Sequence, residues 1–107
     1  MKVLKPGHRY LIEGTVFDVD PVQVEKPDNP QTLVFIEREN GKLINNGATN
    51  EEVLDVLINR MNWLQSKMPC RENAIVITKL EESLMWLNKR TEKRVAQGVE
   101  TFDKPHE

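Results

Sequence analysis

The sequence predicts an α+β fold, in which a small N-terminal antiparallel β section precedes a long antiparallel helical hairpin that forms an oligomer. Cys70 to Arg94 carries apolar residues at helical spacing, and a capping box at Thr49 begins another helical pattern before it. Residues 1–48 instead hold short strand-like runs between turn residues. We expect one compact domain with a β section (1–48), a helical hairpin (49–98) and a flexible tail (99–107).

The β section contains four candidate strands, each rich in β-branched or aromatic residues or alternating in polarity. They are Arg9–Glu13, Thr15–Val24, Gln31–Glu39 and Lys42–Ile44. The loop Lys26–Pro30 has two prolines, which block continuous pairing. Asn40-Gly41 is the strongest short hairpin signal, so the strand that ends at Glu39 should pair with the run that begins at Lys42.

The first helix is expected from about Asn50 to Gln65, with Thr49 as its N-cap and Glu52 reaching back to complete the capping box. Its apolar side chains cover an arc of roughly 220°, which is wider than one partner helix can bury. Either the β section or another subunit must therefore cover the remainder. Arg60 falls inside this arc, where a packed stem with its head on an acidic partner is favoured over a ligand contact.

The second helix is expected to run unbroken from Cys70 to Arg94, opening at Pro69 and stopping by Gly98. Its stripe repeats at intervals of three and four residues and consists of Asn73, Ile77, Leu80, Leu84, Leu87 and Thr91. The short segment between the helices allows only a tight reversal, so the two helices should be antiparallel neighbours.

Composition excludes several classes of protein. Charged residues make up 30% of the chain but nearly balance at a net charge of -2, which argues against a general nucleic-acid coat. The N-terminus has no long apolar run, so neither a signal peptide nor a membrane span is expected. The single cysteine excludes an intrachain disulfide and is consistent with a reducing cytosol.

Residues that could carry catalysis are scarce. Asp18 and Asp20 form a D-x-D pattern, but no second cluster supports a metal site, and a solvated loop is favoured. His8, His106 and Cys70 do not form a zinc-binding pattern. No nucleophile stands beside a base, and no glycine-rich phosphate loop is present. We therefore expect a binding protein without a cofactor rather than an enzyme.

Three features depart from a plain helical hairpin. Asn73 lies on the midline of the apolar stripe, where it either satisfies backbone groups of the first turn or contacts a ligand. Trp63 is either a core residue or a platform whose open face stacks a base. Arg90 and Arg94 share one face and either complement the negative end of the helix or clamp a diphosphate.

Helix length limits how these residues can act together. Asn73 and Arg90 are 17 residues apart, about 25 Å along one helix, so one small ligand cannot touch both within a single chain. Two hairpins packed antiparallel would bring Trp63 and Asn73 of one chain to Arg90 and Arg94 of the other. A twofold dimer would make two equal pockets in this way.

The segment from residue 45 to residue 100 resembles the helical hairpin shared by two related phage anti-defence families, the Thoeris anti-defence proteins and the anti-CBASS cyclic-dinucleotide sponges. The motif C-R-E-N-A-x-x-I-T-K-L-E-E-x-L-M-W-L-x-x-R-T, from Cys70 to Thr91, is specific to this group. KPGHRYLIE and QTLVFIERE resemble the β extension of the Thoeris branch, so we place the chain there. The match covers about Lys5 to Glu100.

The resemblance implies a molecular sponge. Such proteins bind, and do not cleave, the glycocyclic ADP-ribose messenger made by a bacterial TIR-domain protein, so that its NADase effector stays inactive. Members form hexamers built from dimers, and some bind cyclic trinucleotides of CBASS at separate sites. The chain would then act in the cytoplasm of the infected bacterial host cell, with neither a nucleic-acid polymer nor a membrane as its partner.

The resemblance also implies roles for five residues. Trp63 would stack on the adenine, and Asn73 would hydrogen-bond the base or ribose edge. Arg90 and Arg94 would hold the diphosphate, and Arg38 on the β section could face a phosphate in the oligomer. Relatives carry a smaller aromatic at the stacking position, so this chain departs from the family pattern at Trp63.

Two other functions stay open. One is hydrolysis of the messenger, against which the missing nucleophile and base argue. The other is a protein-binding adaptor that uses the apolar arc of the first helix to inhibit a bacterial defence effector directly.

Overall fold

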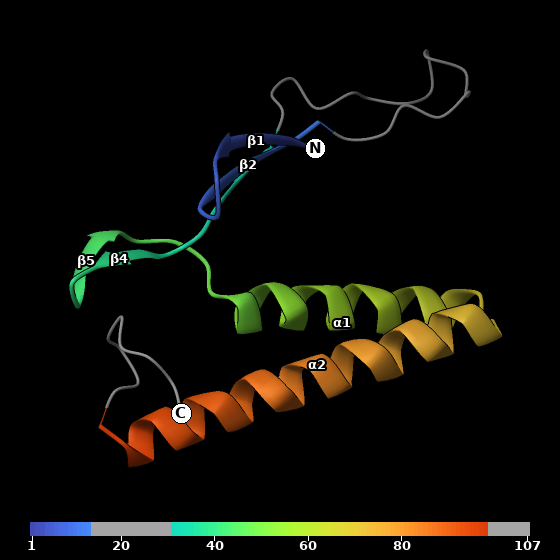
Figure 1. Cartoon of the computed structure of the whole chain (residues 1–107). Coiled ribbons are helices and arrows are strands. Elements are labelled where there is room, and N and C mark those ends of the chain that lie inside the picture. Colours follow the sequence, from blue (N-terminus) through green and yellow to red (C-terminus); the bar gives the residue numbers. More distant parts are fainter. Residues whose placement is uncertain (14–30, 99–107) are drawn as a thin grey trace.

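The computed structural model describes residues 1–13 and 31–98, which form two groups of strands followed by two helices (Figure 1). The expected strand Thr15–Val24, the loop Lys26–Pro30 and the tail from residue 99 lie outside the described residues. The D-x-D pattern and His106 lie outside them too.

The first group of strands is an antiparallel sheet of β1 (Lys2–Lys5), β2 (Arg9–Ile12) and β3 (Gln31–Val34), in the order β1-β2-β3. Strand β2 confirms the strand expected over Arg9–Glu13, whereas β1 was not predicted. Gly7 joins β1 to β2 at a φ of 77°, a left-handed conformation that glycine adopts without steric cost.

The continuous strand predicted over Gln31–Glu39 is wrong, because the chain changes partners in its middle. Strand β3 pairs with β2, and β4 (Glu37–Glu39) pairs with β5 (Lys42–Asn45) in a separate hairpin. The hairpin turn at Asn40-Gly41 is confirmed, since both residues have positive φ, at 52° and 77°.

The break between β3 and β4 follows from a contact with the segment just before the helices. The Ile36 N–H donates to the Ala48 carbonyl at 2.9 Å, and the Ala48 N–H donates to the Val34 carbonyl at 2.8 Å. Gly47 makes this approach possible, because a Cβ there would lie 2.5 Å from the Val34 oxygen. The backbone groups between β3 and β4 therefore bond this segment instead of extending either ladder.

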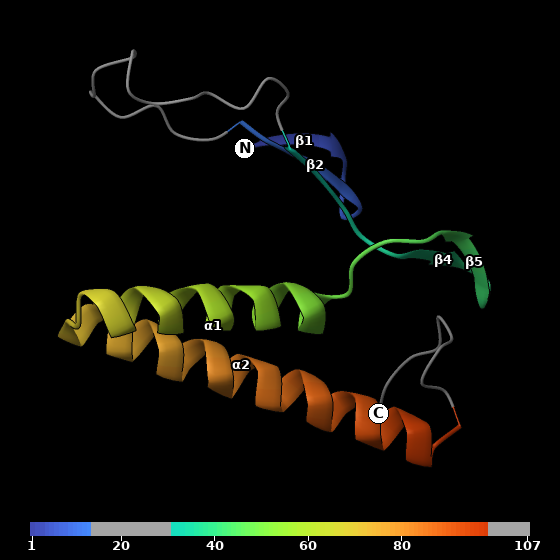
Figure 2. The same ribbon diagram turned by 180° about the vertical axis from the view of Figure 1, so that it is seen from behind.

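Helix α1 (Asn50–Lys67) and helix α2 (Arg71–Ala96) form the expected antiparallel hairpin (Figures 1 and 2). Thr49 Oγ1 caps α1 by accepting from the Glu52 N–H at 3.1 Å, but the reciprocal bond from the Thr49 N–H to the Glu52 carboxylate is absent. The N-cap of α2 is Cys70, whose Sγ accepts from the Asn73 N–H at 3.4 Å. Neither helix is long and apolar enough to cross a membrane.

Within the described parts of the chain, no apolar side chain is buried. The stripe of α2 is half-buried from Asn73 to Leu87, and its last residue, Thr91, is exposed. On α1, Val56 and Leu57 remain 63% and 43% exposed. No Cα atom of a strand lies within 8 Å of a Cα atom in either helix, and Figures 1 and 2 show the strands standing apart from the hairpin. The described strands of the same chain therefore do not cover the rest of the apolar arc.

Candidate functional site

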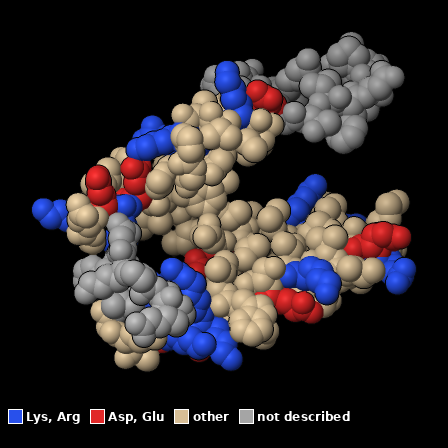
Figure 3. Space-filling view, viewed as in Figure 1, with Lys and Arg blue, Asp and Glu red and all other residues tan. Residues whose placement is uncertain are grey.

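A cleft lies where the β section faces the start of α1 and the C-terminal half of α2. Its volume is about 970 Å³, and Figure 3 shows the molecule hollowed between the β section and the helices. The lining residues are Gly7, Tyr10, Phe35, Ile36, Arg38, Ala48, Thr49, Asn50, Glu51, Leu87, Asn88, Arg90 and Thr91. A space of this size suits a nucleotide-sized ligand.

One wall of the cleft is aromatic. The rings of Tyr10 and Phe35 meet edge to face, with centroids 5.9 Å apart and planes at 87°. Tyr10 comes from β2, and Phe35 follows β3 directly, where its N–H donates to the His8 carbonyl at 2.8 Å. The pairing of β2 with β3 therefore sets the position of both rings.

Two arginines reach the cleft from different elements. Arg38 lies on β4, and Arg90 lies on α2 about two turns before its end. In the part of the chain that the structure describes, neither guanidinium forms an ion pair or a hydrogen bond. Two cations without an ionic partner beside an aromatic wall form a site for an anionic ligand.

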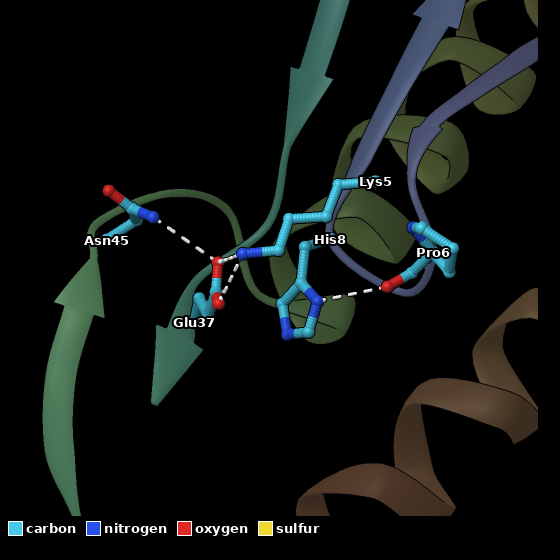
Figure 4. A network of polar contacts seen from close by, with 5 residues as sticks. All are labelled: Lys5, Pro6, His8, Glu37 and Asn45. Atoms are coloured by element: carbon cyan, nitrogen blue, oxygen red, sulfur yellow. Dashed lines mark hydrogen bonds and ion pairs between the residues drawn. The ribbon is translucent and has the colours of Figure 1, made fainter. Parts of the chain in front are cut away.

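A polar network holds β4 in place beside the cleft (Figure 4). Lys5 Nζ lies 2.7 Å from one carboxylate oxygen of Glu37 and 3.0 Å from the other, and Asn45 Nδ2 donates to the same carboxylate at 3.3 Å. The hydrogen bond from Lys5 is the main reason that the pKa of Glu37 is lowered. Because Lys5 ends β1 and Glu37 precedes Arg38, the ion pair links the sheet to the hairpin that carries Arg38.

Trp63 lies away from this cleft, in the last turns of α1. Its side chain is 54% exposed, which argues against a core role within the single chain. Arg60 Cζ and Lys67 Nζ each lie 5.6 Å from the centroid of its ring system, so both cations form cation–π contacts with the indole. The head of Arg60 therefore contacts Trp63, and no acidic partner of Arg60 exists among the described residues.

Asn73 begins α2 near the turn of the hairpin, as expected, and is half-buried. Its backbone N–H is capped by Cys70, while its side-chain amide forms no hydrogen bond within the described residues. The interpretation in which the Asn73 side chain serves the first turn is therefore not supported, and the amide is available to a ligand.

The structure separates four of the five predicted site residues into two groups. Arg38 and Arg90 line one cleft, whereas Trp63 and Asn73 lie toward the opposite end of the hairpin. Arg94 is only 3% exposed and does not line the cleft, so the two arginines of α2 have different environments despite their shared face. The distance along α2 agrees with the expectation that one ligand cannot reach both groups in one chain.

Neither the aromatic pair nor Glu51 carries a sequence pattern that predicts a site. Tyr10 falls within the expected strand Arg9–Glu13, and Phe35 within the strand Gln31–Glu39 that was expected to be continuous. Groups of three or more potential metal ligands are absent from residues 1–13 and 31–98. The functional groups that line the cleft are guanidinium cations, a carboxylate, amides, hydroxyls and aromatic rings.

Two comparisons with known proteins bear on the family of the chain. Residues 30–92 match the family model of the Acb2/Tad1 hairpin domain. The protein called Thoeris anti-defense 1, from Bacillus phage SBSphiJ7, is 55% identical to the chain over 56 residues, which span 51% of this chain and 39% of that relative. The matched family model covers more than half of the chain, which therefore belongs to the Acb2/Tad1 hairpin domain family.

Proposed function

We propose that this chain is a phage anti-defence protein that binds and sequesters cyclic ADP-ribose-type immune messengers, such as glycocyclic ADP-ribose, without cleaving them. Membership of the family and the identity to a Thoeris anti-defence protein support an anti-defence role. The observation that carries the choice of ligand is the convergence of Arg38 and Arg90 on one cleft beside an aromatic wall.

The chemistry of the ligand fits these groups. A cyclic ADP-ribose isomer presents a diphosphate, two ribose rings and a purine, which are satisfied by guanidinium groups, polar side chains and aromatic faces. A sponge that holds a nanomolar messenger must supply about -12 kcal/mol, which requires an enclosed pocket with stacking and paired charges. Loss of an arginine that leaves a phosphate buried and unpaired should cost several kcal/mol.

A second copy of the chain completes the pocket in this proposal. Trp63 and Asn73 of one chain face Arg90 and Arg94 of the other, with the β section of that chain placing Arg38 on the phosphates. An incoming adenine displaces Arg60 or Lys67 from the Trp63 ring, which leaves that cation beside the stacked base. The dimers assemble further into a hexamer, and cyclic trinucleotides of CBASS occupy separate sites on that assembly.

Sequestration acts by mass action in the cytoplasm of the infected host cell. No chemical step is needed, which agrees with a sequence that places no nucleophile beside a base. The messenger stays intact but its free concentration falls below the level that activates the NADase effector.

A protein-binding adaptor is the second candidate, favoured by the exposed apolar residues Val56 and Leu57 on α1. In that case the chain would capture a bacterial defence effector without any nucleotide. A pull-down with nucleotide-free protein separates the two functions, because a sponge retains no effector under that condition.

Protection of a phage from Thoeris in cells tests the proposal. We expect Arg90→Ala and the double variant Arg90→Ala/Arg94→Ala both to lose protection, because each removes the guanidinium of α2 that lines the cleft. Lys89→Ala/Lys93→Ala is the matched control, since it removes two cations at the same spacing on the same helix. All three variants should keep their helical circular dichroism. Protection that survives in either arginine variant would contradict the proposal.

A further inference from the structure

Glu51 is an acidic side chain in a cleft that otherwise suits an anion. It lines the cleft together with Arg38 and Arg90, and it is half-buried. A carboxylate at this place repels the phosphates that the two arginines attract, unless it contacts a different part of the ligand. Its position therefore requires a reason beyond charge balance.

The ordinary role of an acidic residue in the first turn of a helix accounts for its charge but does not require a position inside the cleft. Glu51 and Glu52 both lie in the first turn of α1, where each complements the positive end of the helix. Glu52 does so while exposed and outside the cleft. Among the described residues, the Glu51 carboxylate forms neither a hydrogen bond nor an ion pair. Its acceptor oxygens are thus directed to no group of the described chain.

We propose that Glu51 determines ligand specificity in this cleft by accepting hydrogen bonds from free ribose hydroxyls of the bound messenger. The inference rests on the proposed function, because it assumes that the same cleft holds an ADP-ribose-type ligand. Ribose hydroxyls and the adenine amine are the donors that such a ligand offers, and the proposed pocket stacks the adenine on Trp63, away from Glu51. A carboxylate is a common acceptor for a ribose hydroxyl in nucleotide sites. Asn88 and Thr91 on the facing helix add neutral polar groups suited to the same sugar.

The placement predicts a direction of selectivity. A ribose that carries a phosphate in place of a free hydroxyl would put a second anion against the Glu51 carboxylate and leave it without a donor. The cleft therefore selects ADP-ribose rings with unmodified ribose hydroxyls over phosphorylated ones, although the arginines alone would favour the more negative ligand.

Calorimetry with two probes tests this inference, using glycocyclic ADP-ribose and 2′-phosphorylated cyclic ADP-ribose. Glu51→Gln should bind the first probe about tenfold more weakly and should lose most of the preference against the second. Glu52→Gln is the matched control, because it removes the same charge from the same turn but not from the cleft, and it should behave as the parent protein. Glu51→Asp keeps the negative charge on a shorter side chain. It should therefore bind the first probe more weakly but still prefer it over the phosphorylated probe.

The outcomes separate the two proposals. If the parent protein binds glycocyclic ADP-ribose while Glu51→Gln and Glu52→Gln match it in affinity and preference, Glu51 has no role in specificity and the proposed function stands. If the parent protein binds neither probe, the proposed function fails and the role of Glu51 fails with it.

Discussion

Polar and aromatic side chains near the proposed site differ in whether they have an interaction partner within the single chain. Glu37 is held by Lys5 and Asn45, whereas Arg38 next to it lines the cleft without an ionic partner among the described residues. Trp63 carries two cations on its ring, and the amide of Asn73 has no hydrogen-bond partner there. Arg38 and Asn73 thus have unpaired polar groups among the described residues, and the family resemblance assigns ligand contacts to both.

Trp63 offers a direct test of base stacking. Trp63→Leu should weaken messenger binding at least about tenfold, because stacking of a base on an aromatic side chain contributes roughly 1–3 kcal/mol. Trp86→Leu is a close control, since Trp86 is 62% exposed on α2 and also has a cation, Lys89, 5.6 Å from its ring. If calorimetry shows the same loss of messenger affinity in both variants, Trp63 does not stack on the base.

The pKa of Glu37 tests the link between the sheet and the β4–β5 hairpin. Contact with Lys5 lowers this pKa below its ordinary value of 4.5, so the contact stabilises the fold fully above pH 4.5 and is lost as the pH falls through the lowered value. In an NMR titration, Lys5→Met should raise the Glu37 pKa toward 4.5, while Lys2→Met should leave it unchanged. Identical titration curves for both variants would show that the ion pair does not form in solution.

The sequence predicted some site residues but not their grouping. Arg38 and Arg90 were both expected to meet phosphates, yet their position on one cleft depends on where β4 lies relative to α2, which no local pattern encodes. The cations on Trp63 follow from i−3 and i+4 spacing and could have been found, because Arg60 and Lys67 are helical neighbours of Trp63. The Tyr10–Phe35 pair requires the register of β2 with β3, which the sequence does not specify.

Among the elements, the helices were predicted closely and the strands less so. Periodicity, a capping box and end charges all agree over α1 and α2, so local signals determine these helices. The split of Gln31–Glu39 depends on contacts with residues 47 and 48, and its apolar run contains no local signal for a change of partner. Strand β1 was not predicted because all four of its residues are exposed, and its strand structure comes from pairing with β2.

The N-cap of α1 gives a test at this scale. Thr49→Ala should lower the free energy of unfolding by about 1 kcal/mol, because the Glu52 N–H then loses its acceptor. Chemical denaturation measures this difference, with Thr49→Ser as the control that keeps the hydroxyl and nearly full stability. An alanine variant as stable as the serine variant would mean that the cap contributes nothing.

For the whole molecule, the central feature is that the described residues bury no apolar side chain. Packing of α1 on α2 leaves a large part of the apolar arc of α1 uncovered, and the strands do not cover it. A second hairpin would bury this surface and would also place Trp63 and Asn73 opposite a partner's arginines. Assembly and ligand binding are thus coupled in the proposed sponge.

Substitution on the exposed arc should separate the subunits. Leu57→Glu puts a charge into the apolar surface and should shift the protein to smaller species in sedimentation velocity, with weaker messenger binding. Lys79→Gln changes the net charge by the same amount at a side chain that is 71% exposed on α2, and it should leave assembly unchanged. A parent protein that sediments as a monomer would exclude the shared pocket.

The most direct test of the sponge is to bind glycocyclic ADP-ribose to the purified protein by calorimetry, heat the complex and identify the released compound by chromatography. The proposed function predicts tight binding and release of the intact messenger. Release of a linear or hydrolysed product would identify an enzyme instead. Absence of binding to this messenger, to other cyclic ADP-ribose isomers and to cyclic oligonucleotides would contradict sequestration and leave the protein-binding adaptor as the function.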